Sequence, residues 1–372
     1  MRNIYQKIKQ VISAVFAKRI TFTYDGIKYT VRHFSLKKLI NWIMNEWAAY
    51  TKPLYPWEMP KYLQLEPTNL CNLHCPGCIL GQGHMTRIQG KMSLDEYKKI
   101  VDQLKDYLLL IILFERGEPF LHENIFDMTK YACQREINVT LSTNGHFLNS
   151  LEQVESIVHS GLNHLTVSLD GATPETYKVY RRGGDFNKVI SGIRTLCDIR
   201  NKIGFISPQI ELQFIPTRYN EHEIPLIREL AFNLGVDILS FKTYNPAHEP
   251  EDITYKLLPK NEKYRRFSYN AEGKLIRNKK NLCTKLWNTI CIHWNGDVVP
   301  CCYDHQNDFV LGSIKEQTIS EIWRGAAFAG YRKDFRDNWS SHPLCNNCTY
   351  AYMKPGLFTG EMIYGPKFKS LF

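Results

Sequence analysis

Three cysteines lie close together in the segment 69–78, at Cys71, Cys75 and Cys78. Their spacing, C-x3-C-x2-C, supplies three thiolates, whereas a cubane iron–sulfur cluster takes four ligands. A cluster held by three protein thiolates keeps one iron open to a small molecule, as a catalytic metal site keeps an open position. A zinc site is the alternative, but zinc sites usually combine two paired hooks and four protein ligands. The motif therefore predicts an iron–sulfur cluster at which chemistry can occur.

Short apolar runs that end in small polar residues, Gly or Pro follow the cysteine motif. Such a run is typical of a buried parallel strand that opens into a loop. Three runs, each with its following turn, are 108–114 with 115–119, 138–141 with 142–145, and 165–167 with 168–171. In a parallel barrel the carboxyl ends of the strands face the active site, so these turns are predicted to surround one site.

Helical patterns alternate with these strands. Residues 93–107 carry apolar side chains at helical spacing, with Ser93 as the N-cap and Glu96 three residues later. The same reasoning predicts helices at 125–133, 150–159 and 186–200 and strands at 210–215 and 237–242. Six strand–helix units over about 190 residues fall short of the roughly 250 residues of a closed eightfold barrel.

The cysteine motif and these strand ends, in this order, resemble the radical S-adenosylmethionine (SAM) superfamily. The resemblance implies an α/β fold, a partial and laterally open TIM-like (β/α)6 barrel. It also implies a [4Fe–4S] cluster on Cys71, Cys75 and Cys78, with SAM chelating the open iron. An electron from the cluster then cleaves SAM to methionine and a 5′-deoxyadenosyl radical, which takes a hydrogen atom from the substrate.

The resemblance also implies which strand ends bind SAM. A Gly-Glu-Pro element binds the amino group in the family; Gly117 and Glu118 match it, while Arg116 stands where a second Gly is common. The residues implied around the ribose and carboxylate are Ser142, Asn144, Ser168 and Asp170. The chain departs from the family at Gly77, because an aromatic residue usually precedes the third cysteine and packs near the adenine. The adenine contact is therefore left open.

A second set of cysteines lies in the C-terminal third, at Cys283, Cys301, Cys345 and Cys348. It resembles the auxiliary-cluster extension of radical SAM enzymes, the SPASM domain or its shorter twitch form. The full SPASM pattern has seven cysteines for two clusters, and this chain has none after Cys348. The resemblance therefore implies one auxiliary [4Fe–4S] cluster with four thiolate ligands. A structural zinc site on the same thiolates is the alternative.

Cys302 adjoins the implied ligand Cys301. A turn at Gly296 predicts a hairpin from 291–294 to 298–302 that carries both thiols. In peptide-oxidising relatives an acid can follow this ligand, whereas here a thiol does. A thiol near a substrate radical can return a hydrogen atom, as an epimerase requires, so Cys302 is a candidate catalytic residue. The alternative is a buried thiol that packs as a small apolar residue.

The first 57 residues differ from the rest of the chain. Apolar residues at helical spacing predict two basic amphipathic helices, over 4–16 and 36–47, with a tight hairpin turn at 24–27 between them. The second apolar face consists of Leu36, Leu39, Ile40, Ile43, Met44 and Trp47. Such faces either pack on the protein's own barrel or, through residues 1–50, lie on an anionic membrane surface. The segment is too short and wrongly ordered for a winged-helix peptide-recognition domain.

Length and cysteine usage predict the domain organisation and the compartment. A chain of 372 residues exceeds one ordinary domain, and the predicted parts are an extension at 1–57, a barrel at 58–255 and an auxiliary-cluster domain at 256–372. Eleven cysteines in metal-like groups, without a signal peptide, predict a reducing and oxygen-protected cytoplasm, with peripheral contact at the inner face of the membrane as a further option. No run approaches the roughly 18 apolar residues of a membrane span.

The net charge of +10 does not predict a nucleic-acid partner, because the basic residues are scattered and form no module with aromatic residues. Phosphate-bearing substrates, lipid head groups or an acidic electron donor of the flavodoxin or ferredoxin type account for the excess equally well. Arg181 and Arg182 are candidates for contact with an anionic substrate group.

Together these features predict a radical SAM enzyme that oxidises or epimerises a small polar, sugar or lipid-linked molecule. The cofactor performs the difficult chemistry, and a fully ligated second cluster suits an electron conduit. A peptide-modifying maturase is the alternative within the class. The alternatives from other classes are a two-cluster electron carrier that does not consume SAM, and a zinc-bearing nucleic-acid-binding protein with steeply salt-dependent binding.

Overall fold

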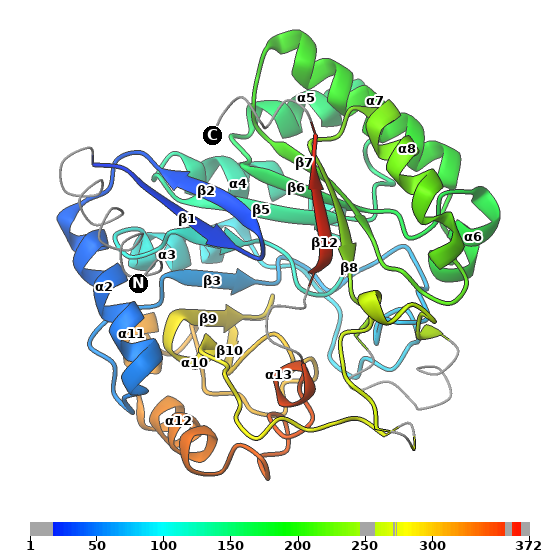
Figure 1. Ribbon diagram of the computed structural model, residues 1–372. Coiled ribbons are helices and arrows are strands. Elements are labelled where there is room, and N and C mark those ends of the chain that lie inside the picture. The colour runs from blue at the N-terminus through cyan, green and yellow to red at the C-terminus, as the bar shows by residue number, and fades with distance from the viewer. Residues whose placement is uncertain (1–17, 246–256, 271, 273, 354–358, 366–372) are drawn as a thin grey trace.

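One mixed sheet organises the molecule (Figure 1). A computed structural model describes residues 18–245, 257–270, 272, 274–353 and 359–365, and places ten strands in the order β11-β10-β9-β3-β4-β5-β6-β7-β8-β12. Strands β3 to β8 are parallel to one another. Their bounds are β3 Tyr62–Leu65, β4 Leu110–Ile112, β5 Asn138–Thr143, β6 His164–Ser168, β7 Gln209–Phe214 and β8 Ile238–Lys242. The predicted α/β class and partial (β/α)6 barrel are confirmed.

Helices connect the parallel strands and cover the outer face of the sheet (Figure 1). They are α3 Leu94–Leu104, α4 Ile125–Cys133, α5 Leu151–His159, α6 Pro174–Tyr180, α7 Phe186–Ile203 and α8 Ile224–Leu234. Side chains alternate along a strand, so one set from each strand packs against the helices in the apolar core. The other set points to the inside of the barrel. Leu141, Leu165 and Leu212 belong to the core set and are fully buried.

Several of these helices begin at or beside the residue that the sequence predicted. Ser93 caps α3, and its side chain accepts from the backbone N–H of Glu96 while the Glu96 side chain accepts in return. This capping box satisfies donors that a helix start leaves unpaired. Helix α4 has the predicted bounds, and Ser150 caps α5 by accepting from Gln153.

The C-terminal part extends the same sheet at both edges. Strand β9 pairs in parallel with β3, and the predicted hairpin at Gly296 (φ +91°) leads into β10. Strand β12 pairs antiparallel with β8 at the other edge. The elements are α10 Lys285–Asn288, β9 Thr289–Ile292, β10 Asp297–Val299, β11 Gly312–Ser313, α11 Ile319–Trp323, α12 Ala326–Asn338, α13 Thr349–Tyr352 and β12 Thr359–Tyr364. The sequence did not predict the pairing with β3 and β8, because partner strands are not encoded locally.

The N-terminal hairpin lies across the inner face of the barrel (Figure 1). Strands β1 (Ile20–Tyr24) and β2 (Ile27–Val31) form the predicted turn and a separate two-stranded sheet. Their apolar side chains pack against Leu110, Ile112 and Ile238 of the barrel. This hairpin therefore covers the inside of the sheet.

Helix α2 (Leu36–Thr51) forms as predicted but does not bury the predicted face. Of that face Leu39 is buried, whereas the exposed residues are Leu36, Ile40, Ile43 and Trp47. Asn41 and Asn45 face inward instead, and both donate to the carbonyl of Met59, at 3.1 and 2.9 Å. The expectation that the whole apolar face packs on the barrel is therefore wrong for this helix. The helix predicted at 4–16 lies outside the described residues.

Candidate active site

The cysteines of the first motif follow β3, and all three line one cavity of about 270 Å³. The backbone N–H of Leu73 donates to Cys71 Sγ at 3.5 Å, and Arg181 Nη1 lies 3.9 Å from Cys75 Sγ. Burial raises the pKa of Cys71 to about 11 and also raises the pKa of Cys75. Since metal ligation requires the thiolate, forming a cluster here must release protons from these buried thiols.

The turn after β4 is fitted closely to the cysteine loop. Gly117 has φ +85°, and a Cβ atom there would lie 2.6 Å from the carbonyl oxygen of Thr68 and 2.7 Å from that of Leu70. Only glycine accommodates both the conformation and the approach. The next residue, Glu118, donates its backbone N–H to the Leu70 carbonyl at 2.7 Å. The turn therefore holds the side chain of Glu118 beside the three thiols.

The carboxylate of Glu118 is buried and accepts three hydrogen bonds. The donors are the Thr143 hydroxyl at 2.8 Å and the backbone N–H groups of Asn144 and Phe120, at 2.7 and 3.1 Å. Burial raises the pKa of Glu118, and these donors oppose the effect. The predicted strand-end residues that line the cavity are Gly117, Glu118, Ser142, Asn144 and Ser168.

Asp170, the sixth predicted strand-end residue, is placed as a partner of Arg181. Its carboxylate lies 2.5 Å from Arg181 Nη2 and accepts from the backbone N–H of Ile215 at 2.7 Å. Arg181 and Ile215 line the cavity, whereas Asp170 is not among the lining residues in the described part of the chain. Asp170 therefore positions Arg181, which the sequence had suggested for an anionic substrate group.

Tyrosine rings occupy the space beside Gly77. A Cβ atom at Gly77 would lie 2.5 Å from Tyr180 Oη and 3.2 Å from Tyr244 Cε2. Tyr180 ends α6 and lines the cavity with the three thiols. An aromatic side chain at residue 77 would therefore have no room, and the aromatic surface at this position comes from a distant part of the sequence.

The four C-terminal cysteines, Cys283, Cys301, Cys345 and Cys348, also converge. They line one small apolar cavity, which Tyr331 and Phe335 of α12 help to close. Burial raises the pKa of Cys283 to about 11 and that of Cys345 to about 12. The structure thus brings together thiols that are 65 positions apart in the sequence.

Cys302 lies outside the walls of these cavities. Its sulfur accepts a hydrogen bond from Lys285 Nζ at 3.2 Å. Its loop contributes Tyr303 and His305 to a second cavity, of about 570 Å³ inside the barrel, and Cys301 to the small apolar one. Among the described residues, Cys302 lines neither. The predicted return of a hydrogen atom by this thiol therefore has no support from its position and stays a prediction.

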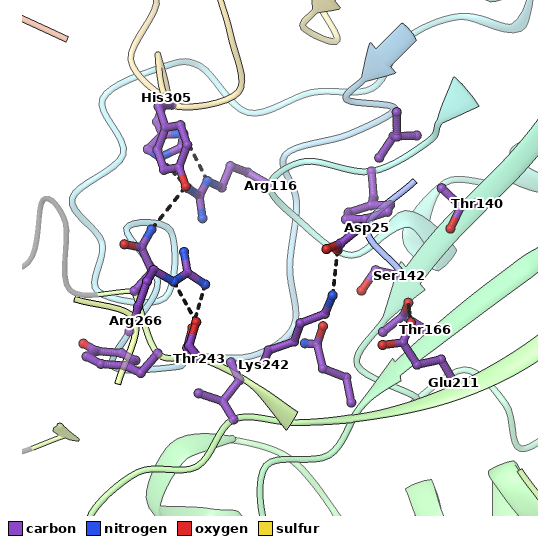
Figure 2. Close-up of a pocket in the computed structure, with 18 of the residues that line it drawn as sticks. Asp25, Arg116, Thr140, Ser142, Thr166, Glu211, Lys242, Thr243, Arg266 and His305 are labelled. Carbon is purple, nitrogen blue, oxygen red and sulfur yellow. Dashed lines mark hydrogen bonds and ion pairs between the residues drawn. The ribbon is translucent and has the colours of Figure 1, made fainter. Parts of the chain in front are cut away.

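A larger cavity, of about 570 Å³, lies inside the barrel (Figure 2). Inward strand residues form one side of it: Thr140, Ser142, His164, Thr166, Glu211, Gln213 and Lys242. The hairpin contributes Tyr24, Asp25, Ile27 and Tyr29, and the loop after β10 contributes Tyr303, His305 and Gln306. Asp25 and Lys242 form an ion pair of 2.6 Å that ties the hairpin to β8.

This cavity adjoins the cavity of the three thiols. Both are lined by Phe114, Arg116, Ser142, Tyr180, Gln213 and Ile215. A molecule in the larger cavity would therefore lie next to one in the smaller cavity.

A buried pair, His164 and Glu211, gives the larger cavity a fixed polar side. His164 Nε2 lies 3.0 Å from Glu211 Oε2, and the Thr166 hydroxyl donates to the same carboxylate at 3.0 Å. Burial by itself raises the pKa of Glu211, but His164 outweighs this and lowers it to about 2. Glu211 is therefore anionic at neutral pH and presents acceptors to the cavity.

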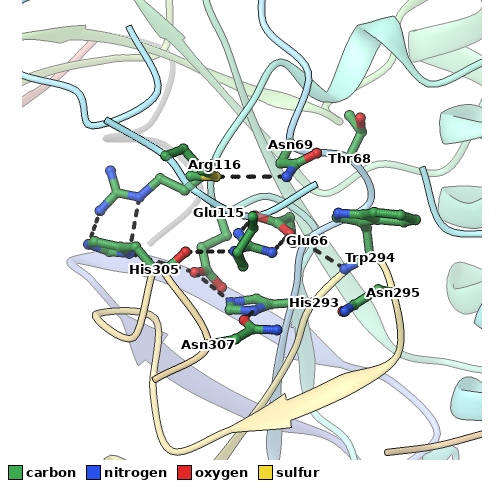
Figure 3. Close-up of polar contacts among 12 residues, drawn as sticks. Glu66, Thr68, Asn69, Glu115, Arg116, His293, Trp294, Asn295, His305 and Asn307 are labelled. Carbon is green, nitrogen blue, oxygen red and sulfur yellow. Dashed lines mark hydrogen bonds and ion pairs between the residues drawn. The ribbon is translucent and has the colours of Figure 1, made fainter. Parts of the chain in front are cut away.

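A buried network beside the cavity joins the barrel to the C-terminal part (Figure 3). Glu115 Oε1 lies 3.2 Å from His293 Nε2 and 4.0 Å from His305 Nδ1. Glu66 accepts two hydrogen bonds from Arg87, at 2.7 and 2.9 Å. Glu66, Glu115 and His293 offer potential metal-ligand atoms within 4.8 Å of one another. Because Arg87 already neutralises Glu66, we interpret the cluster as an ion-pair network.

Comparison with known families identifies the chain. A profile of the Radical SAM superfamily matches residues 65–207, and a profile of the iron–sulfur cluster-binding SPASM domain matches residues 283–349. The chain belongs to the radical SAM superfamily. Its cofactors are therefore SAM and [4Fe–4S] clusters, and the zinc-based alternatives are set aside.

Relatives of this radical SAM enzyme differ in what they modify. The tungsten-containing aldehyde ferredoxin oxidoreductase cofactor-modifying protein of Pyrococcus furiosus is 26% identical over 318 residues, covering 78% of this chain and 87% of that protein. Mycofactocin maturase MftC of Mycobacterium ulcerans is 27% identical over 337 residues, covering 83% and 87%. The structure of Streptococcus suis SuiB bound to precursor peptide SuiA aligns with a TM-score of 0.59 at 14% identity, covering 96% and 88%, and shows a common fold.

The residues of the radical SAM enzyme fit these cofactors. Three thiols share a cavity with the buried acceptor Glu118, and four further thiols surround a space of their own. Throughout the described part of the chain, no helix is both long and apolar enough to cross a membrane. The electron donor stays a prediction.

Proposed function

We propose that this enzyme is a maturase that removes a hydrogen atom from a polar residue of a peptide and leaves that residue oxidised. The wall shared by the two cavities carries this proposal, because a polar substrate group in the larger cavity would lie beside SAM bound in the smaller one. One relative is named as a maturase, and this favours the maturation of a larger precursor over the turnover of a free metabolite. SuiB, which shares the fold, binds a precursor peptide.

The catalytic cluster belongs, in this proposal, to Cys71, Cys75 and Cys78. When bound, the cluster and SAM supply the 5′-deoxyadenosyl radical that removes the hydrogen atom. Glu118 is the acceptor for the SAM amino group, since Asn144 and Thr143 already hold its carboxylate in place. A preorganised acceptor needs no rearrangement when the ligand binds.

The auxiliary cluster belongs to Cys283, Cys301, Cys345 and Cys348. A cluster held by these four thiolates would have no iron open for substrate, and when bound it would supply an acceptor for the electron of the substrate radical. The proton that an oxidised hydroxyl or amine releases passes, in this proposal, to the polar side of the larger cavity that the His164–Glu211 pair forms.

A small polar molecule is the second candidate substrate. The observation that favours it is the hairpin, which contributes residues to the cavity wall and is tied to β8 by the Asp25–Lys242 ion pair. The cavity also has hydroxyl, amide and charged groups among its apolar lining residues, which suits a polyol or an amino sugar.

The radical chemistry is tested by counting iron and assaying 5′-deoxyadenosine after anaerobic reconstitution with SAM and a reductant. We expect about eight irons per chain, and about four each in the Cys71→Ala/Cys75→Ala/Cys78→Ala and Cys283→Ala/Cys345→Ala/Cys348→Ala variants. SAM cleavage should disappear in the first variant and persist in the second. Cys133→Ala/Cys197→Ala is the matched control and should keep all the iron. Cleavage that survives loss of the first three thiols would contradict the assignment.

The substrate class is tested with extracts of cells grown in heavy water. The extract is divided by size, and each fraction is incubated with the reconstituted enzyme. We expect deuterium to enter 5′-deoxyadenosine from the peptide fraction and to be lost after protease treatment. Deuterium transfer from the small-molecule fraction, unaffected by protease, would replace the peptide proposal by the second candidate.

A further inference from the structure

The outward face of α2 is apolar, although the helix lies at the surface. Five exposed side chains follow one another at helical spacing: Leu36 (71% exposed), Ile40 (55%), Ile43 (43%), Trp47 (61%) and Tyr50 (84%). Tyr55 (58%) and Trp57 (85%) follow the helix. We call these seven residues the α2 stripe. A surface helix normally turns such a stripe toward the core.

Polar contacts fix this orientation of the helix. Asn41 and Asn45 donate to the Met59 carbonyl, and the Asn41 side chain accepts from the Met59 N–H at 2.9 Å. Lys38 Nζ donates to the carbonyl of Glu136 at 3.1 Å. Rotating α2 to bury the stripe would leave these groups without partners, which is costly for buried polar atoms. The stripe therefore faces outward in the stable fold.

Most of the chain's net positive charge lies in its first 57 residues, the segment that includes α2. The first 57 residues contain ten basic and two acidic residues, whereas the remaining 315 contain 37 basic and 35 acidic. Lys18, Arg19 and Arg32 are exposed, and Lys37 is exposed but forms an ion pair of 2.9 Å with Asp106. The backbone N–H of Phe34 donates to the Lys18 carbonyl at 2.8 Å, which puts this basic group beside the start of α2.

We propose that the α2 stripe and its flanking basic residues bind the surface of an anionic phospholipid bilayer, with α2 lying in the plane of the interface. Apolar side chains enter the acyl boundary, Trp and Tyr occupy the head-group level, and basic residues are attracted to anionic lipid. A second copy of the chain is disfavoured, because a symmetric contact would bring two strongly basic segments together. The proposal does not depend on the substrate.

The test is co-sedimentation of the reconstituted enzyme with vesicles. We expect binding to phosphatidylcholine vesicles that contain phosphatidylglycerol, weaker binding to phosphatidylcholine alone, and release at high salt. Ile40→Glu/Trp47→Glu should weaken binding to the anionic vesicles at least about tenfold, since two large apolar side chains lose their burial. The matched control is Leu226→Glu/Phe232→Glu on α8, where the residues are 42% and 72% exposed. It should bind like the parent.

Three results of the vesicle assay would overturn the proposal. The parent enzyme fails to sediment with anionic vesicles; the α2 variant binds as well as the parent; or a chain lacking residues 1–17 loses all binding although its stripe is intact. Sedimentation velocity on the same proteins tests whether a second copy of the chain covers the stripe instead. A parent dimer that the α2 variant converts to monomer would assign the stripe to a second copy instead. Both glutamate variants must retain the parent's iron content and circular dichroism.

Discussion

At the scale of single residues, the aromatic ring beside the cysteine loop comes from a distant part of the chain and not from the residue before the third cysteine. Gly77 precedes the third cysteine, where the family usually has an aromatic side chain, and the rings of Tyr180 and Tyr244 fill the adjoining space. Tyr180 lines both cavities and is itself buried. We therefore expect Tyr180 to contact the adenine of SAM.

Replacing Tyr180 with Leu should weaken SAM binding about three- to tenfold, because an aromatic contact contributes roughly 0.5–1.5 kcal/mol beyond its buried area. Tyr180→Phe keeps the ring and should bind nearly as the parent does. Equilibrium dialysis of SAM on the reconstituted proteins measures both. Equal affinity for the Leu variant and the parent would show that the adenine lies elsewhere.

Arg181 and Asp170 form a buried pair whose loss should be costly. Burial raises the pKa of Asp170 even with Arg181 beside it, so the carboxylate depends on this partner. Arg181→Met should lower the free energy of unfolding by about 3 kcal/mol, since it leaves an unpaired buried carboxylate. The double variant Asp170→Asn/Arg181→Met should recover part of this loss. Denaturant unfolding measures both, and a single variant as stable as the parent would contradict the buried pairing.

At the scale of elements, hydrogen bonds decide which way a helix faces. The apolar positions of α2 predict the helix, but Asn41 and Asn45 fix its orientation through Met59. Intrinsic propensity and periodicity do not contain this information, because a carbonyl at residue 59 becomes available only in the folded chain.

Neighbouring positions on α2 should therefore respond in opposite ways to substitution. Asn41→Ala removes two bonds to Met59 and should destabilise the protein by about 1–3 kcal/mol. Ile40→Ser, one position away and 55% exposed, should change the free energy of unfolding by less than about 0.5 kcal/mol. Denaturant unfolding of both variants measures the difference. A larger loss for Ile40→Ser would mean that the stripe is packed.

At the scale of the whole molecule, the barrel and the auxiliary domain share one sheet and one buried network. Strand β9 extends the sheet from β3, and Glu115 contacts His293 and His305 from the C-terminal part. Burial by itself lowers the pKa of His293 and raises that of Glu115. Their mutual attraction outweighs both effects, so the pKa of His293 is raised and that of Glu115 is lowered.

The stabilisation by this pair should depend on pH. Because the pKa of His293 is raised in the folded protein, its protonation stabilises the fold fully below about pH 6.5. This stabilisation is lost as the pH rises through the pKa of His293 in the folded protein. The lowered pKa of Glu115 contributes above about pH 4.5 and is lost as the pH falls further. His293→Gln should therefore cost about 2–3 kcal/mol between about pH 5 and 6.5 and less at higher pH. Unfolding at several pH values measures the gap between parent and variant. A gap independent of pH would contradict the ion pair.

The sequence by itself determined the local features of this protein. Cysteine spacing, the turn with Gly117 and Glu118, the Ser93 cap and the apolar strand runs depend on short-range chemistry, and the structure has them where they were expected. The convergence of four C-terminal thiols followed from their resemblance to a known spacing.

Tertiary structure decided what depends on distant partners. It placed Asp170 behind Arg181, set Cys302 outside the cavities, filled the space at Gly77 with Tyr180, and turned the apolar stripe of α2 outward. It also joined β9 to β3 and β12 to β8. These results depend on contacts between residues that are not neighbours in the chain, and such contacts exist only once the backbone has folded.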